Sequence, residues 1–343
     1  MIRSLPDAGG SWRRVVHEST QSSLAHAPEW FQLIQEAYGH HPIYLSAHDG
    51  QGRWGVLPAF AVRRPFFGTV VTSMPFLDSG GPCAPSLALA RVLVDHLVAE
   101  ARRIGARLVE LRCSEPLSLP VAPIQTKVNM TLHLQNDPDH VWRHFDKTVR
   151  NQVRKAERSG LTIELGGAEK LSAFYDAFVE RMRDLGSPVH APAFLAAVFE
   201  RFGSQARILL VKKGNQTAGG LVALRFKDRL IVPWATSSKE YFPLCPNMLL
   251  YWEAIRMACV EGFSRFDFGR SSRDSGTYRF KAQWGAREEP LFWYTIPIAT
   301  TSTTVNCGTD ESRTRSLLVS SWRHLPLCVT RHLGPRIRRY LIQ

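Results

Sequence analysis

The sequence predicts an α+β protein built from two similar units that follow one another along the chain. Its 343 residues are about twice the length of an ordinary domain. The same order of elements (helix, hairpin, third strand, loop, helix, strand) occurs once in each half. A content of 44% hydrophobic and 21% charged residues is typical of a globular protein with a sizeable core. Each unit is therefore expected to hold a mixed, mainly antiparallel sheet flanked by helices.

The first unit is expected to begin with a helix. Apolar residues recur at helical spacing after Pro28, and Gly39 ends the pattern. Short apolar runs bounded by glycine, proline and aspartate then predict strands, and a second helical repeat ends at Gly105. In chain order these elements are strands at 42–47, 54–60 and 68–74, a Gly/Pro-rich loop at 78–82, a helix at 89–104 and a strand at 108–112.

The second unit repeats this order with little sequence in common. Three helical repeats end at Gly186, Gly203 and Gly262, and turns at Gly214 and Asp228 separate three apolar runs. In chain order the elements are helices at 171–185 and 194–202, strands at 207–211, 218–226 and 230–234, a helix at 247–261 and a strand at 265–268.

These patterns divide the chain into a first unit at 1–136, a second unit at 137–297 and a tail at 298–343. A basic helix at 139–159 is expected to cross from one unit to the other. The tail is basic and rich in serine and threonine, which predicts a linker followed by a loosely held end.

The charge of the chain favours an anionic ligand. The formal net charge is +13, so the field of the protein attracts phosphates, nucleic acid or an anionic membrane face. The positive charge is concentrated in two segments. Five lysines and arginines lie within 147–158 against Glu157 alone, and seven arginines follow residue 300 against two acidic residues.

Several classes of protein are disfavoured by missing motifs. The sequence has no G-x-S-x-G elbow, H-E-x-x-H pair, phosphate-binding P-loop or G-x-G-x-x-G turn. Its six cysteines form no C-x-x-C pair, and its twelve histidines have no metal-ligand spacing, so we predict no metal site. No apolar run reaches the roughly 18 residues of a membrane span, and the first residues lack a secretion signal. A cytoplasmic location is expected.

A first candidate site precedes the predicted helix at 247–261. Because a helix that follows a strand turns free backbone N–H groups outward, the segment 241–247 predicts a phosphate-binding site at Pro246 and Asn247. The alternative is that these two residues only start the helix.

A second candidate site follows the strand at 265–268. Small and charged residues run from Gly269 to Ser272, and an aromatic stretch follows at 276–285. Ligands bind at strand ends in open sheets, so Arg270 and Lys281 are candidates to hold an anion or a developing oxyanion. The alternative is that Asp267 and Arg270 form a structural pair and that the aromatic residues belong to the core.

A third candidate lies in the basic helix. Arg150, Arg154 and Arg158 are four residues apart and therefore line one helical face. Like charges at this spacing repel one another, which an anionic partner would relieve. The alternative is a solvated helix face.

Taken together, these segments resemble the FemAB-like branch of the GNAT acyltransferase superfamily, whose members carry two GNAT-like units in tandem. The resemblance is greatest to the FemAB-like proteins associated with exosortase/PEP-CTERM and exopolysaccharide gene clusters, and it covers residues 28 to 296. The segments that carry it are Arg150-Asn151-x-Val153-Arg154-Lys155-Ala156, Ser159-Gly160-Leu161, Leu185-Gly186-Ser187-Pro188, Pro246-Asn247-x-Leu249-x-Tyr251-Trp252, Phe266-Asp267-Phe268-Gly269-Arg270-Ser271, Tyr278-x-Phe280-Lys281-x-x-Trp284-Gly285, and Pro75-Phe76 with Gly80-Gly81.

The resemblance implies transfer of an acyl group to an amine, with no permanently bound cofactor. The donor is an acyl-CoA or an aminoacyl-tRNA. The Gly-rich pyrophosphate loop of acyl-CoA enzymes is replaced here by Pro243 to Asn247, so both donors stay open. The acceptor is an amine on a sugar-linked or peptide precursor of the cell envelope or of an exopolysaccharide. A Phe-Lys pair near the reacting groups of peptidyltransferase relatives matches Phe280-Lys281.

We accordingly assign three groups of site residues within a cationic cleft of the second unit. The catalytic group is Lys281, Asp267, Arg270 and Tyr278; the donor-binding group is Pro246, Asn247 and Phe280; the substrate-binding group is Arg150, Arg154, Ser271 and Trp284.

Two other functions remain alternatives. One is a nucleic-acid-binding protein that uses the Arg150 helix and the basic segment 336–339. The other is a non-catalytic assembly factor held at the inner face of the membrane by its tail, where Arg338 and Arg339 stand beside the apolar end at 340–342.

Overall fold

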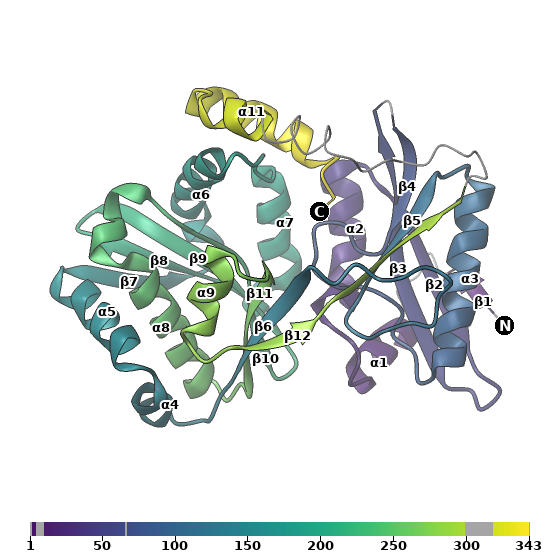
Figure 1. Cartoon of the computed structure of the whole chain (residues 1–343), viewed down its shortest axis with the longest axis horizontal. Coiled ribbons are helices and arrows are strands. Elements are labelled where there is room, and N and C mark those ends of the chain that lie inside the picture. Colours follow the sequence, from purple (N-terminus) through teal and green to yellow (C-terminus); the bar gives the residue numbers. More distant parts are fainter. Residues whose placement is uncertain (1, 5–9, 66, 299–317, 343) are drawn as a thin grey trace.

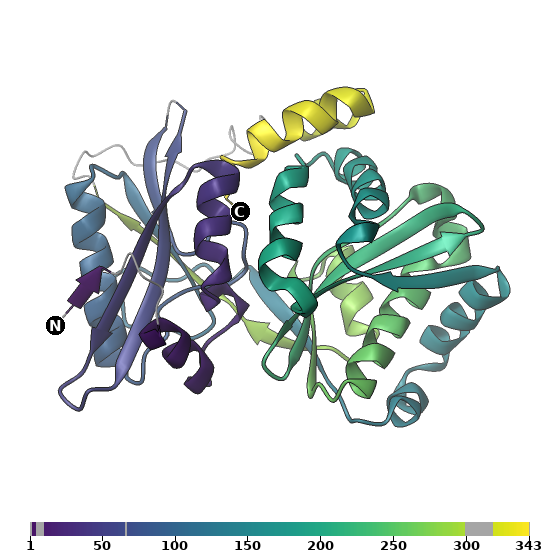
Figure 2. The same cartoon turned by 180° about the vertical axis from the view of Figure 1, so that it is seen from behind.

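The computed structural model describes residues 2–4, 10–65, 67–298 and 318–342. Two mixed sheets, each flanked by helices, lie side by side (Figures 1 and 2). The predicted α+β class with two tandem units is thereby confirmed.

The first sheet has six strands among the described residues, in the order β1-β2-β3-β4-β5-β13. One of its predicted helix boundaries is confirmed, since Gly39 ends α2 in the left-handed conformation. The helix predicted at 89–104 is α3, which Ser86 caps by accepting the Leu89 N–H. The helix α1 and the strands β1 and β13 were not predicted. In chain order the elements are β1 (Ile2–Ser4), α1 (Gly10–Glu18), α2 (Glu29–Tyr38), β2 (His41–His48), β3 (Trp54–Arg64), β4 (Gly68–Thr72), α3 (Leu87–Arg103), β5 (Leu108–Cys113) and β13 (Phe292–Pro297).

The second sheet has seven strands among the described residues, in the order β12-β6-β11-β10-β9-β8-β7. The strands β6, β7 and β12 and the helix α9 were not predicted. In chain order the elements are β6 (Lys127–His133), α4 (Pro138–His144), α5 (Lys147–Arg158), β7 (Leu161–Gly166), α6 (Leu171–Leu185), α7 (Pro192–Phe202), β8 (Ala206–Lys213), β9 (Gln216–Phe226), β10 (Arg229–Ser237), α8 (Pro246–Val260), β11 (Arg265–Ser272), α9 (Gly276–Ala282) and β12 (Arg287–Pro290).

Both sheets are built on one plan. In each sheet, a series of antiparallel strands ends in two parallel strands that one helix connects. The parallel strands are β4 and β5, connected by α3, in the first sheet, and β10 and β11, connected by α8, in the second. An antiparallel strand then pairs with the last member of each series. In the first sheet this strand is β13, and in the second it is β6. The two sheets therefore exchange strands across the predicted boundary at 136/137, since β6 precedes it and β13 follows it.

The predicted basic helix at 139–159 is two helices. The carboxylate of Asp146 accepts the Thr148 N–H at 2.7 Å and starts α5 after the end of α4. Trp142 and Phe145 pack on Trp252, so both helices lie against α8 in the second unit. The prediction that this helix crosses between the units was wrong, because the crossing is made by the segment that leads into β6.

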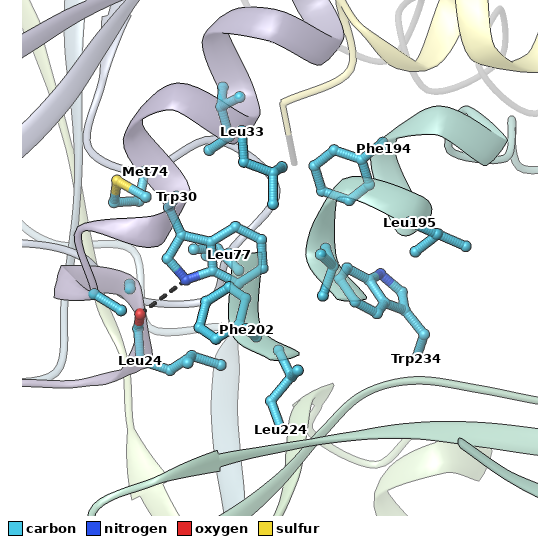
Figure 3. Packing of buried hydrophobic residues seen from close by; sticks show 14 of the residues in the cluster. Leu24, Trp30, Leu33, Met74, Leu77, Phe194, Leu195, Phe202, Leu224 and Trp234 are labelled. Carbon is cyan, nitrogen blue, oxygen red and sulfur yellow. Dashed lines mark hydrogen bonds between the residues drawn. The ribbon is translucent and has the colours of Figure 1, made fainter. Parts of the chain in front are cut away.

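One hydrophobic cluster joins the two units (Figure 3). Trp30 of α2 contacts Phe202 of α7 with ring centroids 5.0 Å apart, and its indole N–H donates to the Leu24 carbonyl at 2.9 Å. Phe194 and Trp234 extend the cluster into the second unit. This shared core holds the relative position of the units, because separating them would expose large aromatic surfaces to water.

The C-terminal segment of the described chain packs against the two units. Residues 318–323 are helical, and α11 (Leu327–Arg338) lies along α6 (Figure 1). Ile342 is fully buried in the cluster shared by the units. The prediction of a loosely held tail is therefore wrong for residues 327–342, because the apolar end of the chain packs between the units. The Thr/Ser-rich stretch at 299–317 lies outside the described residues.

Candidate active site

A cleft of about 920 Å³ lies between the two units. Its walls come from both: the segments around 17–25 and 76–79 belong to the first unit, and those around 226–233 and 265–269 belong to the second. The strand β6, which has crossed between the units, contributes Asn129. The strand exchange therefore puts residues from distant parts of the sequence around one cavity.

The end of β11 forms one wall of this cleft. Its parallel pairing with β10 stops at Ile231 and Asp267, and its pairing with β6 shifts register between Asp267 and Arg270. Gly269 lies at this irregularity with φ +75°, a conformation that L side chains rarely adopt. The irregularity turns Asp267 and Gly269 toward the cleft, where both line the wall.

Asp267 is a buried carboxylate at this wall, with 8% of its surface exposed. Its two oxygens accept the Gly269 N–H at 2.7 Å and the Asn129 side-chain amide at 2.9 Å. Burial raises the pKa of Asp267 to about 6, although both hydrogen bonds and Arg229 oppose that rise. Such a group gains and loses a proton near neutral pH.

Lys281 lies directly behind the wall, on α9. Its ammonium donates to the carbonyls of Gly269 at 2.8 Å and Arg270 at 2.9 Å. Burial lowers its pKa to about 8, against the charges of Asp78 and Asp267. The Lys281 side chain does not line the cleft, but it holds the carbonyl of Gly269, which does line it. Two of its three N–H bonds are committed, and the third has no hydrogen-bond acceptor in the part of the chain that the structure describes.

Asp78 of the first unit completes the arrangement, and we did not predict it. It follows β4 in the Gly/Pro-rich loop, and its carboxylate accepts the Arg270 backbone N–H at 3.2 Å. The Arg270 Nε lies 3.3 Å from the same carboxylate. A carboxylate in a glycine-rich loop after a strand was a usable sequence signal, but nothing in the sequence paired it with Arg270.

A second unpredicted group adjoins Asp267. The Glu289 carboxylate lies 3.2 Å from the Arg229 guanidinium and accepts from the Asn129 amide at 3.3 Å. Asn129 therefore bridges two carboxylates, and Arg229 lies 3.9 Å from Asp267 as well. This network orients the Asp267 side chain and limits the repulsion between the two acids.

The cleft is not the cationic one that we predicted. Its lining includes seven acidic residues and three lysines or arginines, although the whole chain carries a formal charge of +13. The acidic residues are Glu18, Asp78, Glu115, Asp228, Asp267, Glu288 and Glu289; the basic ones are Lys227, Arg229 and Arg265.

The aromatic residues assigned to the site lie mainly in packing contacts. Trp284 is 1% exposed and contacts Phe145, and Phe280 packs on Tyr251. Ser271 is also buried, and its hydroxyl has no partner among the described residues. Tyr278 is half-buried and donates to Glu288, which lines the cleft.

The assigned donor and substrate residues lie outside the cleft lining. Pro246 and Asn247 begin α8, whose first turn has no side-chain cap. Arg150 and Arg154 lie on α5, and the Arg154 guanidinium is 5.8 Å from the Trp142 ring. Of the residues predicted for the site, Asp267, Arg270 and Lys281 are the ones that the structure brings together.

The described residues include neither a cluster of metal-ligand type nor a helix that could span a membrane. None of their histidine, cysteine, aspartate and glutamate side chains form a group of three or more suited to a metal ion. None of their helices is both long and apolar enough to traverse a bilayer.

Comparison with known families identifies part of the chain. Residues 143–282 match the acetyltransferase (GNAT) domain family. This segment includes Asp267, Arg270 and Lys281. No curated protein sequence matches the chain.

Solved structures share the fold of nearly the whole chain. The crystal structure of FemX has a TM-score of 0.67 at 14% identity, covering 86% of this chain and 97% of that chain. The C-terminal domain of a putative lysylphosphatidylglycerol synthetase from Agrobacterium fabrum has a TM-score of 0.54 at 12% identity, covering 90% and 96%. A tandem GNAT protein from the clavulanic acid biosynthesis pathway has a TM-score of 0.51 at 11% identity, covering 87% and 99%. At these identities the likeness is one of fold.

Proposed function

We propose that this chain is an N-acyltransferase that passes an acyl or aminoacyl group from an anionic donor to an amine. One observation carries the proposal: the Asp267 carboxylate, the Gly269–Arg270 peptide and the Lys281 ammonium meet at the wall of the cleft between the units. All three lie in the segment that matches the GNAT domain family.

In the proposed reaction, Asp267 is the general base. The bound ammonium first loses one proton to water. The neutral nitrogen then attacks the donor carbonyl, a C–N bond forms, and the second proton that the nitrogen loses passes to Asp267. The bond from the carbonyl carbon to the sulfur or oxygen of the donor breaks, and the leaving group takes a proton from water. A carboxylate with a pKa of about 6 is suited to this step, because it is ionised at pH 7 and still basic enough to accept a proton.

Lys281 is proposed to stabilise the oxyanion that forms on the carbonyl. The ammonium lies behind the Gly269–Arg270 peptide, so its positive charge acts through the wall of the cleft, and the charge of Arg270 adds to the positive potential there. Such charges act strongly in a site from which water is excluded, because the local dielectric constant is low.

The acidic lining supports a cationic acceptor. An amine reaches the enzyme largely as an ammonium ion, which the carboxylates of the cleft attract. We propose a sugar-linked or peptide amine of a cell-envelope or exopolysaccharide precursor. The sequence motifs quoted above support the exosortase/PEP-CTERM-associated branch.

The donor is proposed to bind at α5 and α8. The uncapped start of α8 carries the positive end of the helix dipole, and Asn247 supplies a backbone N–H there, whereas Pro246 has none. Arg150 adds a buried Nε without a hydrogen-bond partner among the described residues. Both acyl-CoA and aminoacyl-tRNA carry the phosphates that such a site binds.

A thermal-shift titration tests this donor assignment. The true donor raises the unfolding temperature as its concentration rises, since binding at 100 times Kd stabilises the native state by about 2.7 kcal/mol. Acyl-CoAs and charged tRNA are compared with free CoA and uncharged tRNA. We expect Arg150→Gln/Arg154→Gln to abolish the shift and Arg91→Gln/Arg103→Gln, on exposed arginines of α3, to retain it. No shift with any donor would contradict the assignment.

The alternative function as a nucleic-acid-binding protein predicts a different pattern. The exposed cations of α5 would then bind duplex DNA as well as tRNA, whether or not the tRNA is charged, with a steep dependence on salt. Binding that requires the acyl group on the donor favours the acyltransferase.

We also propose a peripheral contact between α11 and the inner face of the membrane. Arg338 and Ile342, which the sequence suggested for this contact, point into the protein. Instead, Leu333 and Ile337 of α11 are about two-fifths exposed at four-residue spacing, so they share one helical face, and Leu341 beyond the helix is equally exposed. Exposed arginines near this face favour anionic lipid.

Vesicle co-sedimentation tests the membrane contact. Binding is expected to vesicles that contain phosphatidylglycerol and to weaken about tenfold or more for Leu333→Asp/Ile337→Asp, since each buried aliphatic side chain contributes about 1.5–3 kcal/mol. Leu87→Asp, at an exposed leucine of α3, is the control and should bind normally. Equal recovery of all three proteins would count against this contact.

A further inference from the structure

The loop at 73–81, which carries Asp78, is held in a strained conformation. Met74 and Phe76 have φ values of +48° and +71°, in the left-handed region that residues other than glycine rarely occupy. Each such residue costs about 1 kcal/mol or more, so the loop keeps this shape only if its surroundings fix it.

Arg112 of β5 supplies part of that support. It is 2% exposed, and its guanidinium donates to the Leu77 carbonyl at 2.8 Å. Its backbone N–H donates to the Ser73 hydroxyl and its carbonyl accepts the Gly80 N–H. Arg112 therefore binds the loop at its start, middle and end.

The rest of the support comes from the last described residues of the chain, Arg338–Ile342, which we call the C-terminal clamp. The Ile342 carbonyl accepts the Phe76 N–H at 3.3 Å and a second hydrogen bond from the Arg112 guanidinium. The Arg338 guanidinium lies 5.6 Å from the centre of the Phe76 ring. The clamp therefore contacts Phe76, the strained residue two positions before Asp78.

The same clamp is anchored to both units. Arg338 Nε lies 3.2 Å from Nε2 of the buried His190, whose Nδ1 lies 2.6 Å from the Tyr38 hydroxyl. Arg339 donates to the Tyr38 carbonyl at 2.8 Å. These bonds connect the clamp to α2 in the first unit and to the segment before α7 in the second. In Figure 1 the C label marks this junction between the units.

We propose that the C-terminal clamp is a positioning element of the active site, which holds Asp78 against Arg270 and beside Lys281. The inference rests on the proposed function, because it assigns the clamp a task in that site. The clamp does not touch substrate. It acts through the loop, and its sequence lies about 260 residues away from the carboxylate that it positions.

A direct physical consequence concerns the Lys281 ammonium. Asp78 and Asp267 stabilise its charge, and Arg270 destabilises it. If the loop relaxes and Asp78 moves away, the pKa of Lys281 falls. The simple loss of a nearby arginine would instead raise that pKa, since one repelling cation is removed. The sign of the change therefore separates displacement of the loop from a direct charge effect.

Two variants of the full chain test the inference, Arg338→Met and a chain that stops after Ile337. The matched control is Arg331→Met, which removes another arginine of α11, paired with Asp176 on α6 but remote from the loop. The titration of Lys281 is followed by NMR of labelled lysine without substrate, and kcat/KM is measured against pH. Thermal unfolding establishes that each variant is folded, and Arg338→Lys tests rescue by a retained charge.

We expect the Lys281 pKa to fall by about one unit in both clamp variants, because that is the usual influence of one nearby opposite charge. The alkaline limb of the pH profile should fall with it, lowering kcat about fivefold at pH 8 with little change in the KM of the donor. Arg331→Met should match wild type, and Arg338→Lys should restore part of the pKa. An unchanged or raised Lys281 pKa in a folded clamp variant overturns the inference, even if wild-type activity is as proposed. An inactive wild-type protein would overturn the proposed function and leave the NMR result to decide the role of the clamp.

Discussion

Replacement of Lys281 by methionine is expected to lower kcat by about 10²–10³-fold, the usual effect of removing one donor that stabilises an oxyanion. Methionine keeps most of the volume of the side chain, so packing around α9 is retained. The loss arises because the wall of the cleft loses the positive charge behind it, and the Gly269 and Arg270 carbonyls lose the ammonium that holds them. Single-turnover rates with saturating donor measure this effect.

The control for this experiment is Lys239→Met. Lys239 is exposed and lies 3.1 Å from Asp184, away from the cleft, so its loss should leave kcat unchanged. A second variant, Lys281→Arg, keeps the charge in a group that does not deprotonate in proteins, so any activity that remains should lose its alkaline limb. If Lys281→Met turned over an identified acceptor at the wild-type rate, the proposed role of this residue would be wrong.

Asp267→Asn is expected to lower kcat/KM by about 10²–10⁴-fold, the range usual for loss of a general base. For the wild-type enzyme we expect a bell-shaped pH profile. The acid limb lies near the Asp267 pKa of about 6, since the protonated carboxyl cannot accept a proton from the amine. The alkaline limb lies near the Lys281 pKa of about 8, since the neutral amine no longer stabilises an oxyanion. In the variant, the acid limb should disappear.

Stability provides an independent check on the same variant. Burial raises the pKa of Asp267 from 3.8 to about 6, so the folded state disfavours the carboxylate at neutral pH. Asparagine removes that penalty, and the free energy of unfolding at pH 7 should rise by up to about 3 kcal/mol. The gain should shrink as the pH falls from 6 towards 4, where wild-type Asp267 is protonated. A variant that is both inactive and unstable would indicate misfolding. The matched control, Glu253→Gln on the outer side of α8, should change neither property.

The predicted site residues that the structure brings together are those whose placement follows from local order along the chain. Asp267 and Arg270 come at the end of an apolar strand, and strand ends in open sheets carry polar ligand-binding groups. Lys281 was a candidate because it follows this strand, and the family resemblance gave it a place near the reacting groups. Phe280 and Trp284 were assigned to the site for the same reason, but they contact other aromatic rings in the core. An aromatic residue in a motif serves packing as well as binding, and the sequence does not distinguish the two.

Asp78, Glu289 and Asn129 escaped prediction because their partners are distant in sequence. Asn129 meets Asp267 only after β6 has paired with β11, a contact across 138 residues. Strand pairing depends on the fit of whole sheets, which local periodicity does not encode. The acidic character of the cleft was missed for a related reason, because a net charge describes the whole chain and not the side chains that one cavity gathers.

The sequence by itself determined the elements and their repetition. Apolar residues at spacings of 3.6 and 2 define helices and strands wherever one face is buried, and glycines such as Gly39 and Gly186 end helices in the left-handed conformation that they tolerate. The tertiary structure alone decided the exchange of β6 and β13, the docking of the chain end and the meeting of Asp78 with Arg270. These are contacts between residues far apart in the chain. They form because burying both sheets and the chain end in one shared core is favourable, and that free energy belongs to the assembled fold and to no single segment.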